Sequence, residues 1–187
     1  MEKIKRIEDI HISPETIGEA GVENEVLVMP EAVDEVFRNK DLVVKEPFTI
    51  HYVAEREKNS EDIHIGVDVH GEIETFCARC LETMTYPVDL HLDTSYMPAS
   101  PEMSENLEEE RTSSATGYYR KTIRLGDYIA SELVLALPLR FICDEQCKGL
   151  CPECGANLNR EECGCREKPV DPRLQKLAEL KEKIRKE

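Results

Sequence analysis

Residues 62–75 read DIHIGVDVHGEIET, and this stretch decides the fold. Apolar and polar residues alternate along it, which is the period of a β-strand with one buried face and one solvated face. A second stretch, TYPVDLHLDTSY at residues 85–96, alternates in the same way after a short connection. Together the two stretches predict a long antiparallel hairpin.

Further β-type segments flank this hairpin. PFTIHYVAERE predicts a third strand through Thr49–Glu55, and NEVLVMP (24–30) and DLVVKEP (41–47) are shorter candidates rich in β-branched residues. YYRKTIRL (118–125) predicts another strand, and LGDYIASELVLALPL (125–139) predicts a helix that ends near Pro138. We therefore expect an α+β fold with an antiparallel sheet, a few helices that follow the strands, and a C-terminal cysteine-rich zinc-binding segment.

Composition limits the classes of function. No run of about 18 apolar residues exists, and the charged start MEKIKRIEDIHI lacks the apolar centre of an export signal, so we expect a cytoplasmic protein without membrane contact. The 39 acidic and 24 basic residues give a net charge of −15, which disfavours broad binding to nucleic acid. In a reducing compartment, clustered cysteines more often bind metals or catalyse reactions than form disulfides.

The chain divides into three predicted parts. Residues 1–140 form the antiparallel-sheet domain, interrupted at 98–117 by PASPEMSENLEEERTSSATG, an acidic segment expected to be a mobile loop rather than a charged helix. Residues 141–167 form a cysteine-rich zinc-binding segment. Residues 168–187 contain an amphipathic helix with Asp171 as N-cap and Pro172 at its first position, and they carry seven basic against four acidic residues.

The eight cysteines have the spacing of metal ligands. Cys151 and Cys154 form a C-x2-C turn followed by Gly155, a residue type that adopts the left-handed conformation expected after the second sulfur. We expect two four-cysteine zinc sites. Their ligands are Cys77, Cys80, Cys143 and Cys147 in the first, and Cys151, Cys154, Cys163 and Cys165 in the second.

Other arrangements of these cysteines stay open at this point. Cys77 and Cys80 could instead join Cys151 and Cys154, leaving the other cysteines for a second site or without a metal, so the protein would hold one or two zinc ions. An iron–sulfur cluster would use the same thiolates. Arg79 and Lys148 lie beside ligand cysteines and could offset thiolate charge, although each could equally be an ordinary solvated base.

No catalytic motif is present. A catalytic zinc usually keeps an open position among histidine ligands, and no histidine lies near the C-terminal cysteines. His64, His70 and His91 are expected on the solvated face of the hairpin, where surface positions are favoured over a site. We therefore expect no enzymatic activity and no small-molecule substrate. The main alternative is a redox-switched chaperone, whose labile zinc–thiolate sites would open when oxidised.

Several of these motifs occur together in a known family. FCARCLE (76–82) between two strands, the helix at 125–139 leading into FICDEQCKGLCPECGANLN (141–159), and the final DPRLQKLAEL (171–180) resemble the bacterial YceD family, the large ribosomal RNA subunit accumulation proteins. The resemblance covers roughly residues 60 to 180. It implies a non-enzymatic role in making or maintaining large-subunit ribosomal RNA, in a gene neighbourhood that often includes a large-subunit ribosomal protein.

The resemblance also separates the two cysteine groups. Other family members lack most of the C-terminal cysteines but keep the turn with Cys77, Arg79 and Cys80, which implies that the second zinc site is an elaboration. An acidic protein that supports RNA accumulation is expected to bind a basic ribosomal protein or assembly factor. Direct binding to ribosomal RNA is a further alternative.

Overall fold

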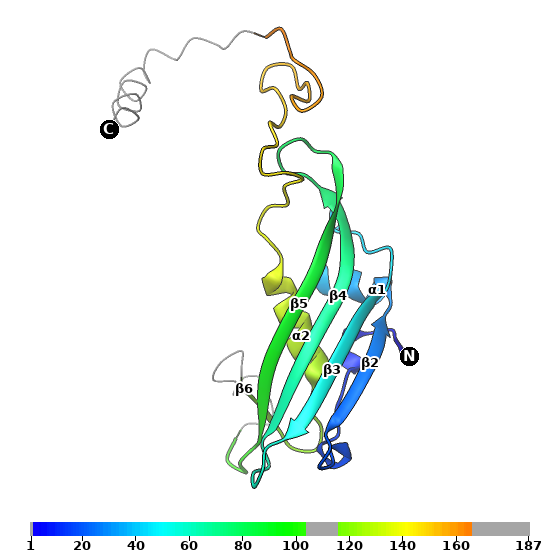
Figure 1. Cartoon of the computed structure of the whole chain (residues 1–187), viewed down its shortest axis with the longest axis vertical. Coiled ribbons are helices and arrows are strands. Elements are labelled where there is room, and N and C mark those ends of the chain that lie inside the picture. The colour runs from blue at the N-terminus through cyan, green and yellow to red at the C-terminus, as the bar shows by residue number, and fades with distance from the viewer. Residues whose placement is uncertain (1, 104–115, 166–187) are drawn as a thin grey trace, which may run out of the picture.

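The predicted hairpin is the longest element of the structure. It comprises β4 (Ile63–Phe76) and β5 (Thr83–Pro98), which pair antiparallel from Ile63 opposite Tyr96 to Phe76 opposite Thr83. The computed structural model describes residues 2–103 and 116–165. In this part of the chain β3 (Phe48–Arg56) pairs antiparallel with β4, as the sequence predicts, but only as far as His70. The far end of the hairpin therefore projects beyond its neighbours (Figure 1).

The complete sheet has six strands in chain order and is mixed, not purely antiparallel. The remaining strands are β1 (Glu2–Ile4), β2 (Val22–Val28) and β6 (Thr116–Tyr119). β1 runs parallel to β2, and β6 runs parallel to β5, so the expectation of an antiparallel sheet was wrong at both edges. Parallel neighbours need crossover connections, and edge strands of three and four residues are too short to show an alternating pattern.

Two other segments differ from expectation. Residues 41–47 form no strand, because the Val44 N–H bonds to Asp34 Oδ1 at 3.1 Å and only Val43 bridges to β4, at Glu74. Helix α1 (Pro30–Phe37) was not predicted and lies between β2 and β3, so helices do not simply follow strands. Helix α2 (Leu125–Ala136) agrees with the predicted helix.

Two predicted segments fall largely or wholly outside the described residues, and a third lies inside them but differs from the prediction. Most of the acidic segment 98–117 lies outside them, and its last two residues belong to β6. The predicted C-terminal helix lies outside them entirely. The predicted strand at 118–125 is a strand only at Tyr118 and Tyr119, after which Ile123 makes a single bridge to Ile12.

The core lies between one face of the sheet and a layer formed by α1, α2 and the N-terminal segment (Figure 1). Alternate residues of β3 and β4 point into it, and the short 3-10 turns η1 (Ile7–Asp9) and η2 (Pro14–Thr16) bring further isoleucines over the sheet. Gly71 makes room for the fully buried Phe48, whose ring would lie 2.3 Å from a Cβ at that position. Neither described helix has the length and apolar run required to cross a membrane.

The opposite side of the sheet is covered by no described helix, and we call it the open face (Figure 1). The side chains on the open face alternate with the buried ones along each strand. Many of them are carboxylates or histidines. They include Glu23, Glu25, His51, Glu55, His64, Asp68, His70, Glu72, Asp89, His91 and Asp93.

Candidate metal centres

The projecting end of the β4–β5 hairpin carries the first cysteine turn, Cys77–Leu81. The Cys77 N–H donates to the Glu82 carbonyl at 2.9 Å, and the Leu81 N–H donates to the Cys77 carbonyl at 2.9 Å. These two bonds close the chain tightly, so the Cys77 and Cys80 sulfurs point the same way. Both cysteines are buried.

The chain after α2 brings the partner cysteines to this turn. Phe141 packs edge-on against Tyr86 of β5, with ring centroids 5.1 Å apart, and its carbonyl accepts from the Ala78 N–H at 2.8 Å. Cys143 follows two residues later, and a turn at Asp144 then presents Cys147. One aromatic contact and one backbone hydrogen bond therefore fix the start of this segment, at Phe141, to the hairpin.

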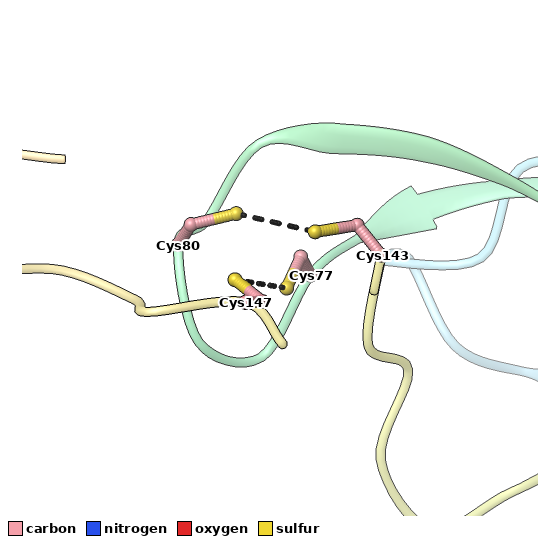
Figure 2. A group of neighbouring side chains, drawn as sticks. All are labelled: Cys77, Cys80, Cys143 and Cys147. Carbon is pink, nitrogen blue, oxygen red and sulfur yellow. Dashed lines mark hydrogen bonds between the residues drawn. The ribbon is translucent and has the colours of Figure 1, made fainter. Parts of the chain in front are cut away.

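The first cysteine cluster, Cys77, Cys80, Cys143 and Cys147, has the geometry of a tetrahedral thiolate site (Figure 2). The sulfurs of Cys77 and Cys147 lie 3.9 Å apart, and those of Cys80 and Cys143 lie 3.7 Å apart. Four sulfurs about 2.3 Å from a central zinc would be about 3.8 Å from one another. The donor set and its spacing thus fit a zinc ion.

The second cysteine cluster consists of Cys151, Cys154, Cys163 and Cys165. Its four sulfurs also lie within 4.8 Å of one another. Cys151 is buried, Cys163 is partly buried, and Cys154 and Cys165 are exposed. The membership of both clusters is the one expected from the sequence, and Cys77 and Cys80 are grouped with Cys143 and Cys147 rather than with Cys151 and Cys154. The binding of a metal by these residues stays a prediction.

The two cysteine turns have the same backbone hydrogen bonds. In the second turn, Cys151–Gly155, the Gly155 N–H donates to the Cys151 carbonyl at 2.9 Å, and the Cys151 N–H donates to the Ala156 carbonyl at 2.8 Å. Gly155 has φ +75°, and its counterpart Leu81 has φ +59°. Leucine rarely adopts this left-handed conformation, which glycine adopts freely. The first turn is therefore strained at Leu81.

Backbone amides control the acidity of the thiols. Burial raises the pKa of Cys77, but N–H groups including those of Cys143 and Cys80 outweigh it and bring the pKa down to about 6. The N–H groups of Cys154 and Glu153 lower the pKa of Cys151, also to about 6. Each cluster therefore contains one cysteine that readily becomes a thiolate, the form that binds metals.

A neighbouring cysteine side chain raises the pKa of one further thiol in each cluster. The Cys77 side chain, followed by burial, raises the pKa of Cys143 to about 12. The Cys154 side chain, again followed by burial, raises the pKa of Cys165 to about 12. Four close sulfurs cannot all ionise without a cation between them, so a divalent ion would relieve the repulsion within each cluster.

Two side chains near the sulfurs hold the cysteine-bearing loops together. The Arg79 guanidinium donates to the carbonyls of Glu145, at 2.8 Å, and Cys147, at 3.1 Å. Asn159, which we did not single out as a ligand neighbour from the sequence, donates through Nδ2 to Cys147 Sγ at 3.3 Å and accepts the Lys148 N–H at 2.7 Å. The pattern CGANLN after the second turn is the signal that could have drawn attention to Asn159.

The predicted histidine positions lie on the open face, each beside a polar partner on a neighbouring strand. His91 contacts Asp68 and His70 contacts Asp89, while His64 contacts Ser95. Within residues 2–103 and 116–165, only the two cysteine clusters bring together three or more side chains that could hold a metal ion. The histidines therefore add no further metal centre to the described part of the chain.

These features define an α+β protein with two all-cysteine clusters, each able to hold a metal ion. The model of one family, described as large ribosomal RNA subunit accumulation protein YceD, matches residues 65–181. The chain belongs to this family. The match includes the first cysteine turn, α2 and both clusters.

Individual proteins similar to this chain come from two mycobacteria and a plant, and the plant protein has the name of this family. Uncharacterised proteins of Mycobacterium tuberculosis and Mycobacterium bovis are 32% identical over 124 residues, which cover 64% of this chain, and the chain spans 58% of their length. An Arabidopsis thaliana protein named large ribosomal RNA subunit accumulation protein YCED homolog 1, chloroplastic, is 36% identical over 64 residues, covering 34% of this chain and 20% of that protein. No solved structure matches the chain.

Proposed function

We propose that this chain is a non-enzymatic, cytoplasmic zinc protein that supports the accumulation of large-subunit ribosomal RNA by binding a basic ribosomal protein or assembly factor. The observation that carries the proposal is the pair of cysteine clusters inside the region matched by the YceD family. The family name supplies the link to large-subunit ribosomal RNA. Metal ions bound by the two cysteine clusters would stabilise the shape of a binding surface.

The zinc ions would have a structural role. Four thiolates complete the coordination of zinc and leave no position for a substrate or an activated water. The segment 141–165 contributes few side chains to the buried core, and its largest anchors are Phe141 and the cysteines themselves. Structural zinc contributes roughly 10–16 kcal/mol of apparent binding free energy in small peptides, which would suffice to hold such a segment against the hairpin.

The charge of the protein favours a protein partner over direct RNA contact. A net charge of −15 repels phosphates at long range, and thiolate ligands would add to it. Ribosomal RNA is bound in the cell by basic proteins, to which an acidic surface is complementary. The proposed role is therefore delivery or protection of such a protein during assembly.

Depletion and rescue in the source organism test this function. Loss of the protein should lower the ratio of large- to small-subunit ribosomal RNA, and the wild-type gene should restore it. A double variant, Cys77→Ser with Cys80→Ser, should not. Pulldown with and without nuclease separates the modes of binding: ribosomal proteins retained after nuclease support the adaptor role, whereas loss of every ribosomal partner contradicts it.

A second candidate function is a redox-switched chaperone with labile zinc. The exposure of Cys154 and Cys165 favours it, because oxidants reach exposed thiolates. In that case peroxide would oxidise the second cluster, release zinc and expose a surface that suppresses aggregation. Peroxide treatment followed by thiol counting and an aggregation assay distinguishes the two functions. Unchanged aggregation of a client protein, with thiols consumed, would eliminate the chaperone.

A further inference from the structure

Helix α2 carries apolar side chains on its outer side as well as on the side that packs against the sheet. Ile129 and Leu133 are fully buried, but Val134 is 47% exposed and Leu135 is 75% exposed. A helix at the surface of a globular protein usually presents charged and polar residues to solvent. Among the described residues, no element covers this outer side of α2 (Figure 1).

Two hollows on the helical side of the sheet meet at Val134. The first, of about 510 Å3, lies between α1 and α2 and is lined by Ala32 and Val36. The second, of about 750 Å3, lies between the first cysteine turn and the chain that follows α2, and Leu81 and Leu139 line it. We call the two hollows together the helical trough.

Exposed apolar side chains are concentrated in the helical trough. Most of the large apolar side chains that are exposed in residues 2–103 and 116–165 line one hollow or the other, and they are Phe76, Leu81, Val134, Leu135 and Leu139. Single apolar side chains are normal on a protein surface, but several that share one depression are typical of an interaction site.

The chain itself contains a segment that suits this surface. Residues 171–187, DPRLQKLAELKEKIRKE, lie outside the described residues, and their sequence predicts an amphipathic helix with Leu174, Leu177 and Ile184 on one side. Such a helix would be about 25 Å long. A helix of this length is marginal in water by itself, so its apolar side needs a surface to pack on. Grooves lined by apolar side chains bind amphipathic helices in this way.

The described chain ends in a region that is joined to the trough. Cys165 belongs to the second cysteine cluster, and the segment leading to that cluster is bonded to the first cysteine turn by the Leu150 N–H and the Arg79 carbonyl at 3.2 Å. The first cysteine turn also lines the trough. Residues 166–170 connect Cys165 to the predicted helix, and an extended connection of this length spans up to about 20 Å.

Charge favours the same occupant. Residues 168–187 carry seven basic against four acidic residues, whereas the whole chain carries 24 basic against 39 acidic ones. The rest of the protein therefore attracts this segment at long range. The family match includes α2, the first cysteine turn and the segment as far as residue 181, as expected if they form one unit.

We propose that residues 171–187 form a third helix that docks in the helical trough of the same chain. Leu174, Leu177 and Ile184 would pack against Val134 and Leu139, and the basic side chains would face solvent. The docked helix would complete the helical layer next to the cysteine-rich end of the hairpin. This inference does not depend on the proposed function, because it concerns contacts within one chain.

Amide hydrogen exchange of the full-length protein, measured by mass spectrometry, tests the docking. We expect the amides of residues 174–184 to exchange at least about tenfold more slowly than in a synthetic peptide of residues 166–187, because docking protects them. Leu177→Asp should restore the rate of the free peptide. Gln175→Asp is the matched control: it makes the same change in charge on the polar side of the predicted helix, and protection should remain.

A second pair of variants tests the trough. Leu139→Asp should also restore the rate of the free peptide, and because Leu139 is fully exposed in the described structure the substitution should leave the fold intact. Val43→Asp is its control, because Val43 is 40% exposed and lines neither hollow. Circular dichroism and metal content of every variant should equal those of the wild type.

Photo-crosslinking distinguishes the possible occupants of the trough. Benzoylphenylalanine at position 139, in a mixture of isotope-labelled and unlabelled full-length chains, should form cross-links to residues 171–187 of the same chain. Such cross-links, with protection lost in Leu177→Asp and Leu139→Asp alone, support the inference. Cross-links between labelled and unlabelled chains would mean that a second copy fills the trough, and they would overturn it.

Three exchange results would also overturn the inference. The first is exchange of the wild-type segment at the rate of the free peptide. The second is protection that survives Leu139→Asp, which would place the segment elsewhere. The third is equal loss of protection in the two control variants.

Discussion

The Arg79 guanidinium donates to the carbonyl oxygen of Cys147 at 3.1 Å, so the first cysteine turn holds the segment that completes its own cluster. The same side chain also reaches the Glu145 carbonyl, and the Arg79 carbonyl accepts the Leu150 N–H at 3.2 Å. Arg79 is therefore a positioning residue at the junction of hairpin and cysteine-rich segment. By contrast, Lys148 contacts Asn159 through its backbone N–H and not through its side chain.

This difference predicts unequal effects for the two bases beside ligand cysteines. Arg79→Ala should remove two hydrogen bonds across the cluster and speed zinc release to a chromogenic chelator several-fold. Lys148→Ala is the matched control and should release zinc at the wild-type rate. Equal rates for all three proteins would contradict the positioning role of Arg79.

Gly126 predicts a packing effect far from the metal centres. A Cβ at this position would lie 1.9 Å from the Ile7 carbonyl oxygen, so Gly126→Ala forces η1 away from α2. We expect the free energy of unfolding to fall by about 1–3 kcal/mol, the range for overpacked sites. Gly18→Ala, where no atom lies within 4 Å of a Cβ, is the control, and denaturant unfolding measures both.

Unlike Gly126→Ala, the substitution Leu81→Gly should not lower the free energy of unfolding. The substitution relieves the left-handed strain at φ +59° and sacrifices little buried area. We expect the free energy of unfolding to stay the same or rise by up to about 1 kcal/mol. A clear loss of stability would mean that the contacts of the Leu81 side chain outweigh the strain of its backbone.

The open face predicts a linked titration of His91 and Asp68. Hydrogen bonding to Asp68, followed by the charge of that carboxylate, raises the pKa of His91, and the same hydrogen bond lowers the pKa of Asp68. Asp68→Asn should therefore lower the pKa of His91, as measured by NMR of its ring protons. An unchanged His91 pKa would show that the two side chains do not interact in solution.

The two pKa shifts also determine how the stability of the folded state changes with pH. A raised histidine pKa stabilises the folded state at pH values below the ordinary value near 6.5, and this contribution disappears as pH rises through the folded pKa. The stabilisation from the lowered Asp68 pKa is present above its ordinary value and is lost as pH falls through its folded pKa. The Asp68→Asn variant should thus lose most stability between these limits, where Asp68 is ionised and His91 is protonated, and less at pH values outside them.

The sequence predicted the central part of this fold because its signal was long and periodic. Alternation over β4 and β5 fixed the hairpin, its inward face and the place of Cys77 and Cys80 at its end. The sequence favoured the observed grouping of the eight cysteines but left open the alternative that joins Cys77 and Cys80 to Cys151 and Cys154. The hairpin depends on a local pattern that the tertiary structure preserves, whereas the first cysteine cluster joins segments that are far apart in the sequence.

The parts that were not predicted depend on long-range contacts. β1 and β6 are recognisable as strands only through their parallel neighbours, and α1 is short, with Ala32 and Val33 as its buried residues. The strain at Leu81 was invisible because leucine, unlike Gly155, does not signal a left-handed turn. The contact of Asn159 with Cys147 joins two loops and has no periodic pattern.

The metal content of freshly isolated full-length protein, combined with X-ray absorption at the zinc edge, tests the central claim most directly. We predict two zinc ions per chain, each surrounded by four sulfurs at about 2.3 Å, with one ion lost in Cys77→Ser and the other lost in Cys151→Ser. A protein that contains no metal, and whose segment 141–165 is nevertheless ordered against the hairpin, would contradict it.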